Sequence, residues 1–181
     1  ETEPGYGWPY NTWMKKWLAD STPTAAEVSK YLTEEYMKAY SGGIYGNQDV
    51  TFSAWDMTKF TAFESAMKAF NASLANMSPT DLTAAKTVAN ETQEFYSSDY
   101  KDIYDFTSKM ESRPGVETGV LSAVKESVQA LVIANGASDY YAGAHGVSVW
   151  MPTSSYYLNE HKERYSKLEF NKATGWLDFL V

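Results

Sequence analysis

The sequence contains no cysteine and only two histidines, His145 and His161, among its 181 residues. The lack of cysteine excludes disulfide bonds, thiolate zinc sites and a cysteine nucleophile supplied by these residues. The sequence also lacks a run of Lys or Arg, and its 15 basic and 23 acidic side chains give a formal net charge of -8. This balance argues against nucleic acid or an anionic membrane as the main partner, because no basic cluster is available to release counterions.

Long apolar runs are missing as well, since none approaches the roughly 20 residues that a membrane-spanning helix requires. The sequence begins with Glu1 rather than with methionine. We therefore expect a processed product or an excised piece, which is compatible with earlier removal of a signal peptide.

The sequence is rich in apolar and aromatic residues. Hydrophobic residues make up 44% of it and aromatic residues 15%, with 14 tyrosines and 6 tryptophans. A chain of this length and composition can bury a core, so we expect residues 1–181 to form a single domain.

The pattern along the chain predicts six segments. They are a loop over 1–10, helices over 11–48, a strand over 50–56, a helical region over 57–135, a strand over 146–152 and a C-terminal tail over 153–181. Glycine and proline exclude regular structure from the first ten residues. The helical region includes one helix expected over about 98–112 and another over 116–134, ended by Asn135-Gly136.

Two local signals support these helices. Thr24 followed by Glu27 has the spacing of a capping box, which indicates a helix start. Apolar side chains recur at three- and four-residue steps over 60–77, and this stripe is expected to face the core; it comprises Phe60, Phe63, Met67, Phe70, Leu74 and Met77.

The two expected strands lie about ninety residues apart, and a two-stranded sheet is marginal in water. Either the two strands pair and pack under the helices, or they are the outer strands of a sheet whose remainder is missing. We favour the second alternative, because an exposed apolar strand edge is a hazard that a self-sufficient domain normally blunts.

Four stretches, in order, resemble the clostripain family of cysteine peptidases. They are ETEPGYGWPY at 1–10, KDIYDFT at 101–107, AHGVSVWMP at 144–152, and YSKLEF at 165–170 with WLDFL at 176–180. The first resembles the segment after the family's catalytic cysteine region. The second resembles its DLYDF helix, the third its late GLSIYFP strand and the fourth its closing stretch.

The resemblance implies an α/β fold, namely the C-terminal part of a caspase-like α/β/α sandwich that is mainly helical with about two strands. It also implies a secreted or cell-surface endopeptidase that cleaves after Arg or Lys with a His/Cys dyad, and a Ca²⁺ requirement in some members. The family's cysteine and histidine lie upstream of Glu1 in this comparison. We therefore expect no cofactor and no peptidase activity in this chain alone. The upstream catalytic portion and a peptide substrate are its expected partners.

The same resemblance places the opening loop at the substrate pocket. There the carboxylates of Glu1 and Glu3 would meet a basic substrate side chain or help to position calcium, and the rings of Tyr6, Trp8 and Tyr10 would form the walls. The alternative is a tight turn whose aromatic rings pack on the helix that carries Trp13 and Trp17. A competing function is a stand-alone secreted module that binds carbohydrate or protein through its many aromatic residues.

The remaining polar residues suggest no catalytic or metal-binding site. We expect His145 to be a strand-entry residue bonded to backbone, and His161 to be solvated. The acidic residues Asp99, Asp102 and Asp105 lack the pattern of a calcium loop and are expected on a solvated face. No pair of acids indicates a glycoside hydrolase.

Overall fold

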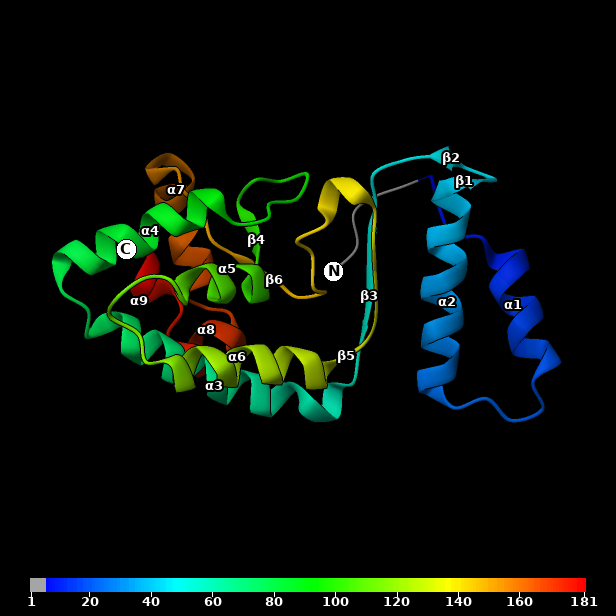
Figure 1. Cartoon of the computed structure of the whole chain (residues 1–181), viewed down its shortest axis with the longest axis horizontal. Coiled ribbons are helices and arrows are strands. Elements are labelled where there is room, and N and C mark those ends of the chain that lie inside the picture. Colours follow the sequence, from blue (N-terminus) through cyan, green and yellow to red (C-terminus); the bar gives the residue numbers. More distant parts are fainter. Residues whose placement is uncertain (1–5) are drawn as a thin grey trace.

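The computed structural model describes residues 6–181. At one end, α1 (Tyr10–Ala19) and α2 (Ala25–Tyr40) form a helical hairpin, which a two-stranded sheet connects to a larger helical body (Figure 1). The predicted capping box begins α2: the Thr24 hydroxyl accepts the Glu27 N–H, and the Glu27 carboxylate accepts the Thr24 N–H. A short ribbon of β1 (Ser41–Gly43) and β2 (Gly46–Asn47) follows α2.

The connecting sheet consists of β3 (Thr51–Trp55) and β5 (Val132–Ala137), which run antiparallel with Thr51 opposite Ala137. Helix α2 packs against both strands. Gly136 makes this close approach possible, because a Cβ atom at that position would collide with the side chain of Met37 on α2.

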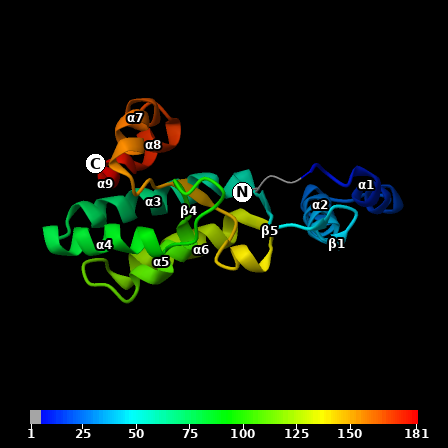
Figure 2. The same cartoon turned by 90° about the horizontal axis from the view of Figure 1, so that it is seen from above.

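The helical body is built around α3 (Phe60–Ala75), which follows the short 3₁₀ helix η1 (Met57–Lys59). Helices α4 (Pro79–Glu91), α5 (Ile103–Met110) and α6 (Thr118–Leu131) lie on one side of α3. Helices α7 (Ser155–Tyr165), α8 (Glu169–Thr174) and α9 (Leu177–Leu180) gather on the other side (Figure 2). The predicted apolar stripe is core: Phe63, Met67, Phe70 and Leu74 are buried between these layers.

A second sheet, in the helical body, pairs β4 (Tyr100–Asp102) with β6 (Ser148–Trp150) in antiparallel register. The short 3₁₀ helix η2 (Asp139–Tyr141) lies between β5 and β6 in the chain. The strands predicted over 50–56 and 146–152 are therefore present, but they do not pair with each other. Within residues 6–181, each pairs with one strand from the region that was predicted to be helical.

Four expectations about local structure are wrong. The segment predicted to be helical over 11–48 ends in the β1–β2 ribbon, because α2 stops at Tyr40 and Gly42 follows with a φ of 83°. The helix predicted over 116–134 ends at Leu131, because Val132 and Ile133 extend into β5 and pair with β3. The helix predicted over 98–112 begins at Ile103, because the Asp102 side chain caps it and residues 100–102 form a strand. The C-terminal tail contains α7, α8 and α9; α7 was missed because it has no buried residue and so no apolar stripe.

Candidate functional site

The loop before α1 is fixed on α2 through Gly7. The Gly7 N–H donates to the Tyr40 hydroxyl at 2.8 Å, and that hydroxyl donates to the Gly7 carbonyl oxygen at 2.8 Å. Gly7 has a φ of 138°, a conformation that side chains with a Cβ rarely adopt. The ring of Trp8 then lies 5.0 Å from that of Phe52 and 6.3 Å from that of Tyr36, measured between centroids. The loop is therefore held at the junction of α2 and β3.

Three of the predicted site residues expose their aromatic rings, and together they are called the aromatic surface here. Tyr6 is 75% exposed, Tyr10 59% and Trp8 38%, and the rings of Trp8 and Tyr10 stack with centroids 6.4 Å apart. Tyr10 also approaches Trp13 at 6.2 Å, which is a contact with an α1 tryptophan of the kind that the tight-turn alternative anticipated. Glu1 and Glu3 lie outside the described residues. What this surface binds stays a prediction.

The sequence interpretation missed the partners that hold this surface in place. The Tyr6 ring lies 6.4 Å from that of Tyr45, and the Tyr45 ring stacks on Tyr40 at 4.8 Å. The four-residue spacing of Tyr36 and Tyr40 on α2 was visible as one helical face. Nothing local, however, connected that face to the opening loop more than thirty residues earlier.

A buried carboxylate joins the second sheet to the loop that precedes β6. Asp102 is fully buried, and its two carboxylate oxygens accept the N–H groups of Asp105 at 2.9 Å and of His145 at 2.7 Å. Burial raises the pKa of Asp102 to about 7, even though these N–H donors favour the ionised form. The expectation of a solvated face is thus wrong for Asp102, because its carboxylate caps α5 from inside the protein.

His145 uses its backbone, not its ring, for that contact. Its imidazole packs on the Tyr104 ring with centroids 4.3 Å apart, and partial burial lowers the pKa of the imidazole. A shallow cavity of about 300 Å³ lies beside the imidazole, and Gln129 and Asn135 also line this cavity. Because the sequence supplies no cysteine, this histidine has no thiol partner within the chain.

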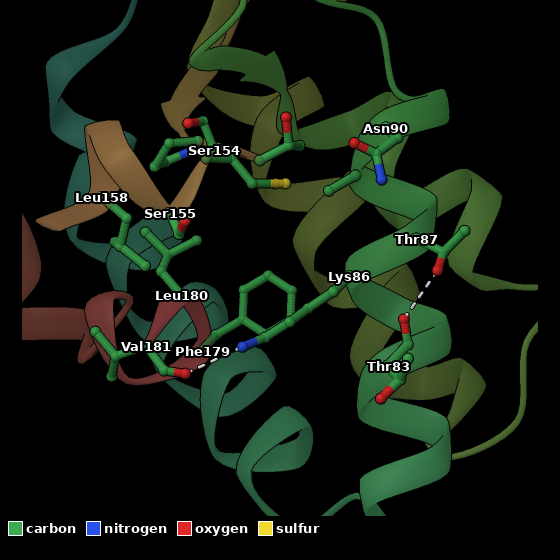
Figure 3. Close-up of a pocket in the computed structure, with 14 residues that line it drawn as sticks. Thr83, Lys86, Thr87, Asn90, Ser154, Ser155, Leu158, Phe179, Leu180 and Val181 are labelled. Carbon is green, nitrogen blue, oxygen red and sulfur yellow. Dashed lines mark hydrogen bonds between the residues drawn. The ribbon is translucent and has the colours of Figure 1, made fainter.

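A larger cavity of about 470 Å³ lies between α4, the start of α7 and the C-terminal residues of the chain (Figure 3). The Lys86 ammonium donates to the Val181 carbonyl oxygen at 3.0 Å, and Figure 3 shows its side chain crossing in front of the Phe179 ring. The hydroxyls of Thr83 and Thr87 donate to carbonyls of their own helix. The lining therefore offers polar groups and one cation, without a nucleophile paired to a base.

Within residues 6–181, no group of three or more His, Cys, Asp or Glu side chains is arranged to hold a metal ion. The calcium requirement that the resemblance implies stays a prediction, because Glu1 and Glu3 lie outside the described residues. In the same range, no helix is long and apolar enough to cross a membrane.

The fold is that of part of the C11 cysteine proteases. An inactive zymogen C11 protease from Parabacteroides distasonis superposes with a TM-score of 0.65 at 19% identity, over 93% of this chain and 48% of that one. A clostripain from Bacteroides thetaiotaomicron in complex with a peptide inhibitor gives 0.65 at 15%, over 93% and 71%. A secreted C11 cysteine protease from the same organism gives 0.61 at 17%, over 96% and 50%.

The family follows from the sequence comparison. The model of the clostripain family matches residues 1–181, and the chain belongs to that family. It spans about half the length of two of the solved relatives. No curated protein matches the sequence.

Proposed function

We propose that this chain is the non-catalytic C-terminal portion of a clostripain-like cysteine endopeptidase that cleaves after Arg or Lys. One observation carries the proposal: the clostripain family model matches all of a sequence that contains no cysteine. A peptidase of this type needs a thiolate to attack the scissile carbonyl and an imidazole to handle the proton. Both groups would come from a portion that precedes Glu1, and that portion would be this chain's main partner.

In this proposal the chain supplies scaffold and part of the substrate pocket. The rings of Tyr6, Trp8 and Tyr10 would form a wall of that pocket, since they are exposed yet anchored through Gly7 and Phe52. Rigid aromatic surfaces bind peptide side chains at low cost in conformational entropy. Glu1 and Glu3 would add negative charge for a basic substrate side chain. Secretion is proposed by analogy with the secreted relative from B. thetaiotaomicron.

The test compares residues 1–181 alone with the same residues joined to the segment that precedes them in the gene. Both products are assayed with peptides that contain a single Arg or Lys. We expect cleavage by the joined product only. Hydrolysis by residues 1–181 alone would contradict the proposal, and so would an inactive joined product that folds. Tight glycan binding by the short chain would instead support the binding-module alternative.

The substrate-wall assignment has its own variants in the joined product. Replacing Tyr6 and Tyr10 by alanine should raise KM by roughly fivefold with little change in kcat, because about 1 kcal/mol of aromatic contact with the bound substrate is lost. Tyr156→Ala is the matched control, since Tyr156 is equally exposed but lies on α7. Equal KM values for the two variants would contradict the assignment of the aromatic surface to the substrate site.

A further inference from the structure

A third cavity, of about 330 Å³, lies between the second sheet and α7, away from the opening loop. Its lining comprises Tyr100, Trp150, His161, Arg164, Tyr165 and Leu168. Small-ligand sites in proteins begin at about 300 Å³, so this space is sized for one small group rather than for a folded segment.

The floor of this cavity is aromatic and rigid. Trp150 is only 7% exposed, and its ring packs on that of Tyr165 with centroids 4.7 Å apart. Its carbonyl oxygen accepts the indole N–H of Trp176 at 2.9 Å, and its backbone is paired with Tyr100 across the β4–β6 ladder. These contacts fix the floor before any ligand arrives. The Trp150 face is too well covered to serve as an open stacking platform for a sugar ring.

The rim carries a cation without a partner. The sequence has two arginines, and Arg113 lies 3.6 Å from the Glu91 carboxylate. The side chain of Arg164 makes no ion pair and no hydrogen bond to any residue in the range 6–181. On the same helix, the ammonium of Lys162 donates to Asn159 instead. The chain as a whole has a net charge of -8. The unpaired guanidinium of Arg164 is therefore a position where the negative charge of a bound ligand would be stabilised.

His161 also lines this cavity. The His161 ring stands edge-on to Trp150 at 6.5 Å. Arg164 therefore supplies the permanent positive charge of the lining.

We propose that this cavity binds the C-terminal residue of a peptide that ends in an apolar or aromatic side chain. The side chain would rest on the rings of Tyr100 and Tyr165 and on Leu168, next to the covered Trp150. The terminal carboxylate would accept two N–H groups of the Arg164 guanidinium. Such a planar, two-point contact suits a carboxylate, while the buried aromatic floor favours an apolar side chain over a sugar. The proposal does not depend on peptidase activity, because it concerns residues far from the proposed substrate wall.

The test uses two tripeptides that differ only in the terminal group: Gly-Gly-Phe as the free acid and as the amide. Binding to residues 1–181 is followed by NMR, through the indole N–H of Trp150 and the guanidinium of Arg164. We expect the acid to bind at least tenfold more tightly than the amide, and the acid with terminal serine to bind more weakly than that with phenylalanine. Added salt should reduce the preference for the acid.

Variants separate the guanidinium from general charge effects. Arg164→Gln should bring the acid down to the affinity of the amide, whereas Arg113→Gln, which removes the other arginine, should change neither. The proposal is overturned if acid and amide bind equally, if neither shifts the Trp150 signal at 10 mM, or if glucuronic acid binds as tightly as Gly-Gly-Phe. An Arg113→Gln variant that also loses the preference would overturn it as well.

Discussion

The sharpest prediction concerns the pH dependence of stability and rests on Asp102. Its buried carboxylate accepts two backbone N–H groups, which favour the ionised form, yet burial outweighs them and raises the pKa to about 7. An aspartate in an unfolded chain has a pKa of about 3.9. Between these two values, the folded protein holds a proton that the unfolded chain has released.

The sign and size of the effect follow from this difference. Because the folded state binds the extra proton, the stabilisation is fully present below about pH 4 and is lost as the pH rises towards 7. A shift of about three units, at about 1.4 kcal/mol per unit, sets an upper limit of about 4 kcal/mol on the loss. Asp102→Asn cannot titrate and keeps one accepting oxygen, but its amide nitrogen cannot accept the second backbone N–H. The variant therefore carries a pH-independent loss of about 1–3 kcal/mol for the N–H left without an acceptor.

The measurement is urea denaturation of wild type and Asp102→Asn from pH 4.5 to 8. At pH 4.5 the variant should be less stable than wild type by about 1–3 kcal/mol, because one buried N–H has lost its acceptor. Between pH 4.5 and pH 8 the difference in the free energy of unfolding should shift by about 2–4 kcal/mol in favour of the variant. NMR titration of the Asp102 carboxyl carbon reports the pKa directly and should give a midpoint near 7.

Asp56→Asn provides a control of opposite sign. Hydrogen bonds from the Thr58 hydroxyl and N–H lower the pKa of Asp56, so its stabilisation is present at neutral pH and is lost on acidification. The Asp56→Asn protein should therefore have a lower free energy of unfolding than wild type at neutral pH. The reasoning fails if the difference in free energy of unfolding between wild type and Asp102→Asn stays constant with pH, or if wild type becomes relatively more stable at high pH. Either result would mean that the N–H donors outweigh burial in setting the pKa of Asp102.

Three further changes test the fold. Phe70→Ala should lower the free energy of unfolding by about 3–5 kcal/mol in urea denaturation, because Phe70 is fully buried against Phe106 and Trp176. Gly136→Ala should lower the melting temperature by forcing Met37 away from β5, and shortening the neighbour with Met37→Ala in the same chain should restore part of the loss. Thr24→Ala should cost about 1 kcal/mol through loss of the α2 cap, with an unchanged denaturant m-value; no loss would show that the capping box is dispensable.

The elements that the sequence predicted are those with a repeating apolar face or a capping residue. The stripe from Phe63 to Leu74 identified α3, and Thr24 with Glu27 marked the start of α2. The missed strands lack such signals. β4 has only three residues, and β5 continues without a break from the last turn of α6. Only the partner strand decides that Val132 and Ile133 are extended, and β3 lies some eighty residues earlier in the chain.

At the candidate site, too, features with a local sequence signal could be predicted and features that depend on distant packing could not. The aromatic residues of the opening loop could be predicted as a group, because Gly7 and the neighbouring prolines exclude a helix there. Their anchors on α2 and β3 could not, because the contacts of Trp8 with Tyr36 and Phe52 depend on how distant elements pack. Arg164 was equally hidden, since an unpaired charge is recognised only when every possible partner has been placed.

Asp102 explains why two of the stretches that resemble the clostripain family belong together. Residues 101–107 and 144–152 are separated by more than thirty residues, yet β4 pairs with β6, and the Asp102 carboxylate accepts the N–H of His145. Its other oxygen caps α5, and the Ile103 N–H donates to the Val147 carbonyl oxygen. One buried acid thus ends a strand, begins a helix and positions the entry to a second strand. Replacing either stretch alone would leave buried backbone groups of the other stretch without hydrogen-bond partners. This would lower the free energy of unfolding far more than a substitution at an exposed residue.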